Sequence, residues 1–294
     1  MLDYPSLAAI AAVVREGTFE RAATALGITP SAVSQRVRGL EERLGSILIN
    51  RGHPCEPTPL GRDLCAHYDQ VRLLEHDLAP VLNLAAAPPV LPIAVNADSF
   101  ATWFHLAIAT FGQTDGVSLD FKLDDEAHTA DRLRRGEVLA AVSADPTPVQ
   151  GCKTIELGAL PYAACASPAF IARYFSTGVN PQTLAHAPYL RFDRRDFQQA
   201  RWAREAHNVE LTAPTHWVPS THGFLDFTLS GLGWGLQPLT MVKPHLASGR
   251  LLELQPGVRL KVKLYWIVAR LQAGLLRHLT ESVRAAAARE LQQD

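Results

Sequence analysis

Residues 18–44 contain two short helix patterns joined by a tight turn, and they constrain the fold more than any other part of the chain. Thr18 can cap the first helix, and Gly27 can end it in the left-handed conformation. Thr29 can cap the second helix, and Pro30 suits its first position, where no backbone donor is needed. The apolar residues of the second helix recur at helical spacing: Val33, Val37, Leu40 and Leu44. The pattern predicts a helix-turn-helix.

The polar side of the second helix has the order of residues that DNA recognition requires. Short hydroxyl donors near the N-terminus can approach phosphates, and amide or guanidinium groups further along can reach base edges in the major groove. The outward-facing candidates are Ser31, Ser34, Gln35 and Arg38, with Arg36 beside them. A helical hairpin with no nucleic-acid partner would show the same pattern, and the region is only weakly basic. The spacing alone favours DNA binding, but it does not exclude a helical hairpin that binds no nucleic acid.

The same region resembles the N-terminal signature of LysR-type transcriptional regulators. The similarity is carried by residues 19–23, 31–37 and 40–45, then by 48–51, which look like the family's wing, and by 58–61, which look like the start of its linker helix. The chain departs from the family at Pro30, where many relatives have Gln, and at Ile49, where an aromatic residue is usual. The resemblance implies groove or phosphate contacts along the recognition helix and a wing contact to DNA, made by Pro30, Ser31, Ser34, Gln35, Arg36, Arg38 and Arg51.

Composition limits the class of protein. The chain has 294 residues, 47% of them hydrophobic, so it can bury more than one core, and its net charge of -1 gives no bias toward membranes or nucleic acid. No apolar run is long enough to span a membrane, and the N-terminus lacks the basic and apolar regions of a signal peptide. We therefore expect a cytoplasmic protein with no membrane partner.

Catalytic and metal-binding motifs are not apparent in the sequence. The four cysteines and eleven histidines lack the spacing of a metal site, so we expect no metal and no cofactor, and we interpret the cysteines as packed thiols. Redox sensing by Cys152 and Cys165 is the less favoured alternative. The glycines of residues 230–235 lack the spacing of a dinucleotide loop, and no nucleophile elbow or phosphate loop is present. We expect that the chain is not an enzyme.

Apolar residues after residue 60 follow alternating steps of three and four, which is typical of a helix that pairs with another helix. They are Leu64, Val71, Leu74, Leu78 and Val81. A buried helix of one domain could show the same stripe. We expect a homodimer, with pairing into tetramers left open, whose two recognition helices read an interrupted inverted repeat in double-stranded operator DNA. The predicted boundaries are 1–58 for the winged helix-turn-helix and 59–87 for the linker and dimerisation helix.

Beyond Pro89 the pattern alternates between strands and helices, which predicts an α/β domain over residues 88–294. Strands are expected at 91–95, 117–123, 139–142, 162–166, 189–192, 216–218 and 264–268, with helices at 99–111 and at about 273–291. The family resemblance implies an effector-binding domain similar to periplasmic binding proteins, with two subdomains joined by two crossovers. We place subdomain I at 88–161 and 266–294, and subdomain II at 162–265, with a ligand cleft between them.

Polar residues after the predicted strands are candidates for effector binding, because open parallel sheets bind ligands at the carboxyl ends of their strands. The candidates are Asn96, Asp98, Ser99 and Thr102, then Asp124 and Glu126, and in subdomain II Asp193, Ser220 and Thr221. The helix start near Ser99 can attract an amino-acid carboxylate. Asp98 either caps that helix or neutralises a ligand ammonium. The acidic segment 124–126 either attracts a cationic ligand or is a solvated turn.

Three further segments resemble the branch of the family that controls arginine and lysine export: residues 95–99, 132–138 and 157–160. This resemblance implies lysine or arginine as the effector, an amino-acid exporter gene or a related gene as the target, and RNA polymerase as a partner. Two alternatives stay open. One is a LysR-type regulator of another metabolic operon with a different effector, and the other is an architectural DNA-binding protein without a ligand.

Overall fold

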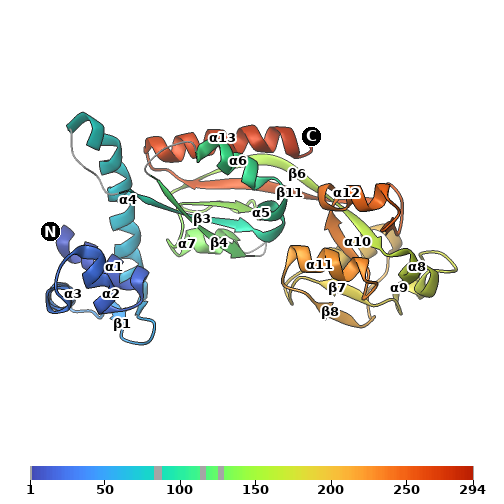
Figure 1. The fold of residues 1–294 in the computed structure, drawn as a ribbon, viewed down its shortest axis with the longest axis horizontal. Helices are drawn as coiled ribbons and strands as arrows, with labels where there is room; N and C mark the ends of the chain where they lie inside the picture. Colours follow the sequence, from blue (N-terminus) through green and yellow to red (C-terminus); the bar gives the residue numbers. More distant parts are fainter. Residues whose placement is uncertain (1, 83–87, 113–116, 125–128, 294) are drawn as a thin grey trace.

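The computed structural model describes residues 2–82, 88–112, 117–124 and 129–293. Three parts follow one another along the molecule (Figure 1): an N-terminal helical unit, a long helix that rises from it, and an α/β domain with two subdomains. Along the described residues, no helix is both long and apolar enough to cross a membrane.

The N-terminal unit is a three-helix bundle with a short two-stranded wing. Its elements are α1 (Tyr4–Glu16), α2 (Phe19–Leu26), α3 (Pro30–Leu44), β1 (Ile49–Asn50) and β2 (Glu56–Pro57). The side chain of Thr18 caps α2 and that of Thr29 caps α3. Gly27 has a φ of 65°, so it ends α2 in the left-handed conformation that favours glycine. The predicted helix-turn-helix is confirmed.

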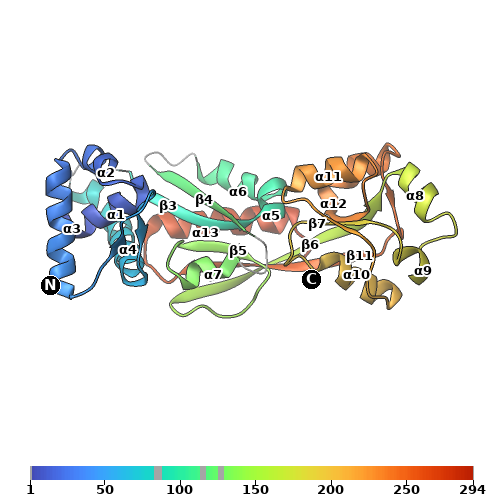
Figure 2. The same cartoon turned by 90° about the horizontal axis from the view of Figure 1, so that it is seen from below.

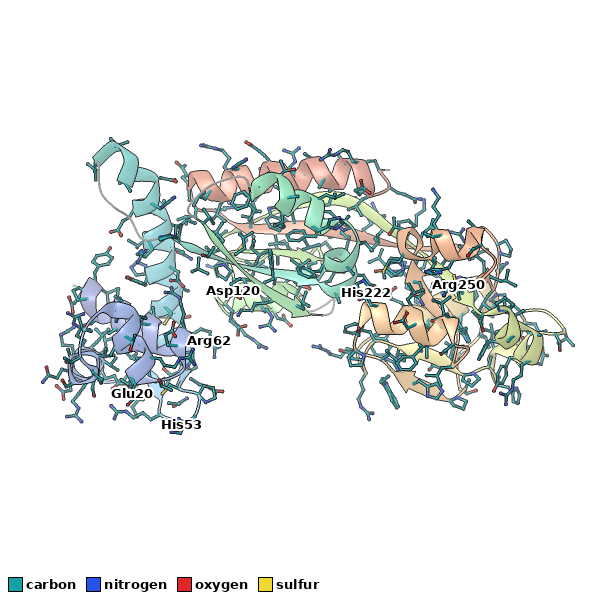
Figure 3. The ribbon with its side chains drawn as sticks, viewed as in Figure 1. Glu20, His53, Arg62, Asp120, His222 and Arg250 are labelled. Carbon is teal, nitrogen blue, oxygen red and sulfur yellow. The ribbon has the colours of Figure 1, made fainter. Side chains whose placement is uncertain are left out.

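Helix α4 (Pro59–Leu82) connects the N-terminal unit to the rest of the chain. Its first turns approach the wing so closely that a Cβ on Gly61 would lie 2.0 Å from the carbonyl oxygen of Leu48, so only glycine fits there. Leu64 packs in the N-terminal core, while Leu73 packs in the core of the α/β domain. Arg62 on α4 forms an ion pair of 3.1 Å with Glu137, which fastens the helix to the α/β domain (Figure 3).

One seven-stranded sheet runs through both subdomains, in the order β10-β6-β11-β5-β3-β4, with β9 paired to β6. The strands are β3 (Val90–Asn96), β4 (Ser118–Asp124), β5 (Ala140–Ser143), β6 (Cys152–Ala166), β9 (Gly235–Pro238), β10 (Leu252–Glu253) and β11 (Arg259–Ala269). β3 is parallel to β4 and β5, while β6 and β11 are antiparallel. The predicted strands at 162–166 and 264–268 are only the ends of β6 and β11. Both strands continue through the predicted subdomain boundaries, and the register shifts between Leu264 and Tyr265.

Subdomain I has helices on both faces of this sheet (Figure 2). α5 (Ala97–Thr102), α6 (Phe104–Phe111) and α13 (Gly274–Glu290) lie on one face, and α7 (Thr129–Arg134) lies on the other. The predicted helix over 99–111 is therefore two helices, because the chain turns at Trp103. Successive residues of one helix point about 100° apart, and the turn lets Trp103 and Phe104 both enter the core with their rings edge to face.

Subdomain II consists of short elements around a tryptophan-rich core. They are α8 (Pro168–Tyr174), α9 (Pro181–Leu184), β7 (Tyr189–Arg191), α10 (Gln198–His207), β8 (Thr215–Trp217), α11 (Thr221–Leu229) and α12 (Leu239–Ala247). Trp202 and Trp234 are at most 2% exposed, and their ring centroids are 5.4 Å apart. β7 and β8 form a separate parallel pair. The predicted strands at 189–192 and 216–218 are found here within one residue at each end.

Candidate DNA interface and effector cleft

Helix α3 has one apolar side and one polar side. Val33, Val37 and Leu40 are at most 1% exposed and pack in the N-terminal core. The predicted DNA-binding residues lie on the other side, where Pro30, Ser31, Gln35 and Arg38 are exposed and Ser34 and Arg36 are half-buried. A helix anchored by one side with hydroxyl, amide and guanidinium groups on the other has the geometry that major-groove reading requires.

Three arginines at this surface are available for phosphate contacts. Arg36, Arg38 and Arg51 form no ion pair with any residue that the structure describes, whereas Arg43 lies 3.8 Å from Asp3. The guanidinium of Arg51 lies 5.3 Å from the ring centroid of Phe19, which holds this wing residue beside α2.

The wing is tied to the recognition helix by a carboxylate that the sequence analysis did not single out. Glu41 on α3 accepts a hydrogen bond of 2.8 Å from the backbone N–H of Leu48, just before β1. Ile49 is 2% exposed and packs in the core, so this position is filled without the usual aromatic residue. The wing and the helix are therefore held together as one unit.

A cleft lies between the two subdomains and has an outer and an inner part. The outer cavity, of about 690 Å³, is within the range of about 300–1,000 Å³ that is usual for small-ligand sites. Its lining includes Phe100, His105, Asp193, Arg195, Ser220 and His222. Figure 3 labels His222 at this boundary between the subdomains. The smaller inner pocket shares Ala97, Phe192 and Thr221 with it and adds residues from α5, α10 and β9.

Asp98 connects the two subdomains across the inner pocket. One of its carboxylate oxygens accepts a hydrogen bond of 2.9 Å from the Thr221 hydroxyl on α11, and the other accepts one of 2.8 Å from the Tyr162 hydroxyl on β6. The N-cap of α5 is Asn96, which makes no side-chain capping bond. Asp98 is the second residue of α5 and lines the inner pocket.

Asp196 and Gln199 also line the inner pocket, and the sequence analysis missed both. Asp196 is 8% exposed, and it accepts hydrogen bonds from the backbone N–H groups of Phe192 (2.8 Å) and Gln198 (3.0 Å). Gln199 is 2% exposed, and its Oε1 has no hydrogen-bond partner among the described residues. The signal in the sequence was weak: an acidic residue just before a helix, which is typical of a cap.

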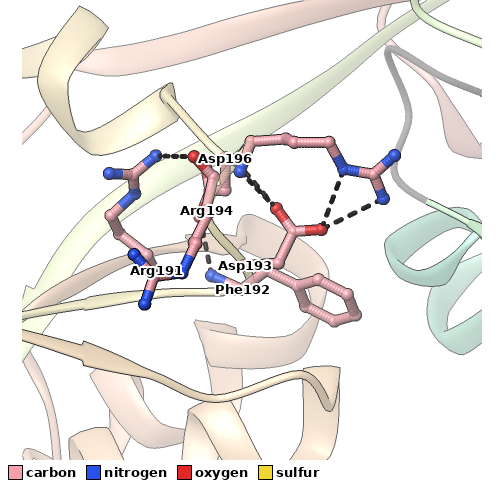
Figure 4. A network of polar contacts seen from close by, with 6 residues as sticks. Arg191, Phe192, Asp193, Arg194 and Asp196 are labelled. Carbon is pink, nitrogen blue, oxygen red and sulfur yellow. Dashed lines mark hydrogen bonds and ion pairs between the residues drawn. The ribbon is translucent and has the colours of Figure 1, made fainter.

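Asp193, which was predicted to face the effector, lies in the outer cavity with its charge paired. Its carboxylate accepts hydrogen bonds from Arg195 Nη2 (3.2 Å) and Nε (3.3 Å), and the close view in Figure 4 shows this pair beside the loop that carries Asp196. Within segment 191–197, Asp196 occupies the inner pocket and Asp193 the outer cavity.

The remaining predicted effector residues are placed differently. Ser220 lines the outer cavity and caps α11 by accepting the N–H of Gly223. Thr102 donates its hydroxyl to the carbonyl of Asp98 at 2.6 Å and does not line either cavity. Asn96 and Ser99 are at most 1% exposed and line neither cavity. Asp124 ends β4 in register with Asn96, and Glu126 lies outside the described residues.

Comparison with known protein families decides the class of the chain. Residues 5–62 match the bacterial regulatory helix-turn-helix protein, lysR family, and residues 89–288 match the LysR substrate binding domain. The chain belongs to the LysR family. It is a LysR-type transcriptional regulator with an N-terminal DNA-binding unit and a C-terminal effector-binding domain, as predicted.

Two curated relatives of this LysR-type regulator match along almost the whole chain. The HTH-type transcriptional regulator ArgP of Pseudomonas aeruginosa PAO1 is 45% identical over 290 residues, which is 98% of this chain and 96% of the relative. The HTH-type transcriptional regulator LysG of Mycobacterium tuberculosis H37Rv is 40% identical over 288 residues, covering 97% and 94%. The predicted branch of the family is confirmed by these relatives.

Solved structures agree with the fold. ArgP from Mycobacterium tuberculosis superposes with a TM-score of 0.85 at 38% identity, covering 100% of both chains. Full-length LysG from Corynebacterium glutamicum, solved with bound effector Arg, gives a TM-score of 0.74 at 35% identity, covering 99% of this chain and 100% of that one.

The cysteines of this LysR-type regulator are all free thiols. Burial raises the pKa of Cys165 to about 12, with a further contribution from the charge of Glu253. Burial and the charge of Asp69 likewise raise the pKa of Cys65 to about 12. Thiols with such raised pKa values hold their protons at neutral pH and are poor nucleophiles, which agrees with the interpretation of these residues as packed thiols.

Proposed function

We propose that this regulator binds free arginine or lysine in the cleft between its subdomains and controls the gene of an amino-acid exporter or a related gene. One observation carries the proposal: the carboxylates of Asp98 and Asp196, one from each subdomain, line the same inner pocket. The similar LysG protein from Corynebacterium glutamicum, with its bound effector Arg, supports this choice of ligand.

The two parts of the cleft together offer complementary groups for both ends of a basic amino acid. We expect a guanidinium or ammonium group of the ligand to lie between Asp98 and Asp196, because charge-assisted hydrogen bonds to carboxylates are short and strong. The Oε1 atom of Gln199 is a further acceptor for a ligand N–H. The α-carboxylate would face the outer cavity, toward Arg195 and the N-terminal end of α11, whose backbone N–H groups favour an anion.

A ligand held by both subdomains would change their relative arrangement. Binding can shift the regulator between two states only as far as the ligand prefers one of them. Arginine between Asp98 and Asp196 would stabilise the arrangement of the subdomains in which the Thr221 hydroxyl also reaches Asp98. We infer that this arrangement is the one that alters contacts with operator DNA and RNA polymerase.

We infer further that the regulator is a homodimer paired through α4. The exposed fractions of Leu74, Leu78 and Val81 are 37%, 56% and 77%, and these residues lie at helical spacing on one side of α4. A second copy of α4 would cover this stripe as in a coiled coil. Two recognition helices would then read an inverted repeat. Pairing of such dimers into tetramers is compatible with a dimer formed through α4.

Isothermal titration calorimetry tests the ligand assignment. Arginine and lysine should bind, whereas citrulline, which has nearly the shape of arginine without its charge, should bind far more weakly. Asp196→Asn should weaken arginine binding by about tenfold or more, because a hydrogen bond to a charged group contributes roughly 1.5–3 kcal/mol. Asp120→Asn, at an acid that pairs with Lys122 outside the cleft, is the matched control. Equal affinity for arginine and citrulline would contradict the proposal.

A further inference from the structure

A second groove of ligand size lies in subdomain I, outside the effector cleft. Its volume of about 670 Å³ is within the range of about 300–1,000 Å³ that is usual for small-ligand sites. The lining comes from the first residues of β6, the end of β11 with the loop after it, and one side of α13. None of the described residues that line this groove also lines the effector cleft. We call it the α13 groove.

The floor of the α13 groove is the face of the sheet that α13 covers. Lys153 on β6 is paired with Val268 on β11, so their side chains point to the same face. Trp266, two residues earlier on β11, points to that face as well, and its Nε1 donates a hydrogen bond of 3.0 Å to the hydroxyl of Thr280 on α13. Lys153 therefore projects into the space between the sheet and the helix.

Three arginines complete the cationic lining of the groove. Arg270 directly follows β11, and its Nε donates a hydrogen bond of 3.0 Å to the carbonyl of Cys152 at the start of β6. Arg277 and Arg284 are seven positions apart on α13, and residues at this spacing lie on the same side of a helix, about two turns apart. The sheet and the helix thus bring guanidinium groups to the groove from two sides.

The charges of the α13 groove are not balanced within the chain. Among the described residues, none of its four cationic side chains forms an ion pair, whereas Lys263 on β11 pairs with Glu156. The only carboxylate among the described lining residues is that of Glu281. Because the whole chain has a net charge of -1, this excess of positive charge is local. A cavity lined by one sign of charge attracts ligands of the opposite sign.

We propose that the α13 groove binds a nucleoside diphosphate or triphosphate. The planar fork of donors on arginine matches phosphate oxygens in pairs, and a phosphate chain concentrates several negative charges in the space of one ligand. Apolar side chains lie between the cations, namely Ile155, Val268 and Leu276, and a nucleobase would cover them.

Other anions suit the α13 groove less well. The carboxylates of an acidic peptide are spread along a backbone that would have to enter the same volume. Duplex DNA keeps its bases stacked, so it would use the cations alone and leave the apolar floor uncovered. The bound nucleotide would lie beside Gly274, whose N–H donates a hydrogen bond of 2.6 Å to Asp77 on α4, the helix that carries the DNA-binding unit.

Isothermal titration calorimetry of the full-length regulator with ATP, without arginine or divalent cations, tests the proposal. Arg277→Ala and Arg284→Ala should each weaken ATP binding by about tenfold or more, and alanine suits both helical positions. Arg289→Ala, at an exposed arginine of the same helix outside the groove, should bind ATP as the unchanged protein does. Inorganic triphosphate, which lacks the base and the ribose, should bind about tenfold more weakly than ATP.

Four outcomes would overturn the proposal. They are no binding of ATP by the unchanged protein, equal affinity for ATP and triphosphate, full ATP affinity in both groove variants, and tighter binding of a hexaglutamate peptide than of ATP. Loss of operator affinity in Arg277→Ala would assign the groove to DNA instead. Arginine titrations of the groove variants should match the unchanged protein, so this test is independent of the effector assignment.

Discussion

Thr221 and Asp98 are 123 positions apart in the sequence, yet the Thr221 hydroxyl donates a hydrogen bond of 2.9 Å to the Asp98 carboxylate. Thr221 begins α11 in subdomain II, and Asp98 lies in the first turn of α5 in subdomain I. This bond joins the two subdomains at the inner pocket. It makes the arrangement of the subdomains sensitive to whatever else binds the Asp98 carboxylate.

Replacing Thr221 by Val removes the donor and keeps the shape of the side chain. We expect arginine affinity to fall about tenfold or more, because a hydrogen bond to a charged group contributes roughly 1.5–3 kcal/mol, even though Asp98 keeps its bond from Tyr162. Calorimetry measures the change. Thr240→Val, at an exposed threonine on α12, serves as the control. A Thr221→Val protein with unchanged affinity would show that the bond between the subdomains has no part in ligand binding.

Gln35 and Arg38 are expected to contribute differently to DNA binding. Arg38→Ala should weaken binding to all duplexes and reduce the slope of log affinity against log salt by about 1, because one phosphate contact is lost. Gln35→Ala should mainly reduce discrimination between operator and unrelated DNA, by about 1–3 kcal/mol. Fluorescence anisotropy over a salt series measures both, with Arg250→Ala as the control. A salt slope that does not change in Arg38→Ala would remove this residue from the interface.

Leu78 tests the role of α4 in assembly. Leu78→Asp places a charge in the centre of the exposed apolar stripe, and it should convert dimers to monomers in analytical ultracentrifugation and weaken operator binding. Leu252→Asp introduces the same charge at a partly exposed leucine in subdomain II, and it should leave the sedimentation coefficient unchanged. A Leu78→Asp dimer as tight as that of the unchanged protein would place the interface elsewhere.

The ion pair of Glu253 with Arg259 predicts a pH dependence of stability. Burial acts to raise the pKa of Glu253, but the hydrogen bonds from Arg259 and from the backbone N–H of Gly257, together with the charge of Arg259, outweigh it and lower the pKa. A lowered pKa means that the ionised carboxylate stabilises the folded state. This contribution is complete above the ordinary glutamate pKa of about 4.3, and it is lost as the pH falls through the lowered pKa.

Glu253→Gln should therefore lower the free energy of unfolding by about 1 kcal/mol or more at neutral pH. The difference from the unchanged protein should disappear in acid, and urea denaturation across this pH range measures it. Glu156→Gln breaks a pair with Lys263 in which both side chains are about half exposed, so its effect should stay within about 0–1 kcal/mol. If the difference in the free energy of unfolding between Glu253→Gln and the unchanged protein stayed the same in acid, the ionised carboxylate would not be the source of the stability.

The N-terminal unit could be predicted closely from the sequence because its determinants are local. Thr18, Gly27 and Thr29 fix helix ends through their own side chains or backbone, whatever the rest of the chain does. The long strands β6 and β11 could not be predicted in full. Residues 259–264 of β11 alternate between the two faces of the sheet, and Lys261 and Lys263 interrupt the apolar run that a buried strand would show.

The inner pocket was predicted only in part, for a different reason. Asp98 comes soon after strand β3, and Thr221 begins helix α11. Open sheets bind ligands at the carboxyl ends of their strands, so both residues could be predicted. Asp196 and Gln199 enter the pocket because the loop after β7 folds back onto the start of α10, and the loop is held by hydrogen bonds to the Asp196 carboxylate. A turn of this kind depends on tertiary contacts that leave no periodic signal in the sequence.

A crystal structure of the regulator grown with arginine tests the ligand assignment most directly. We predict that arginine lies in the cleft, with its guanidinium nitrogens about 3 Å from carboxylate oxygens of both Asp98 and Asp196. Arginine bound outside the cleft, or oriented with its α-carboxylate next to these two aspartates, would contradict this assignment.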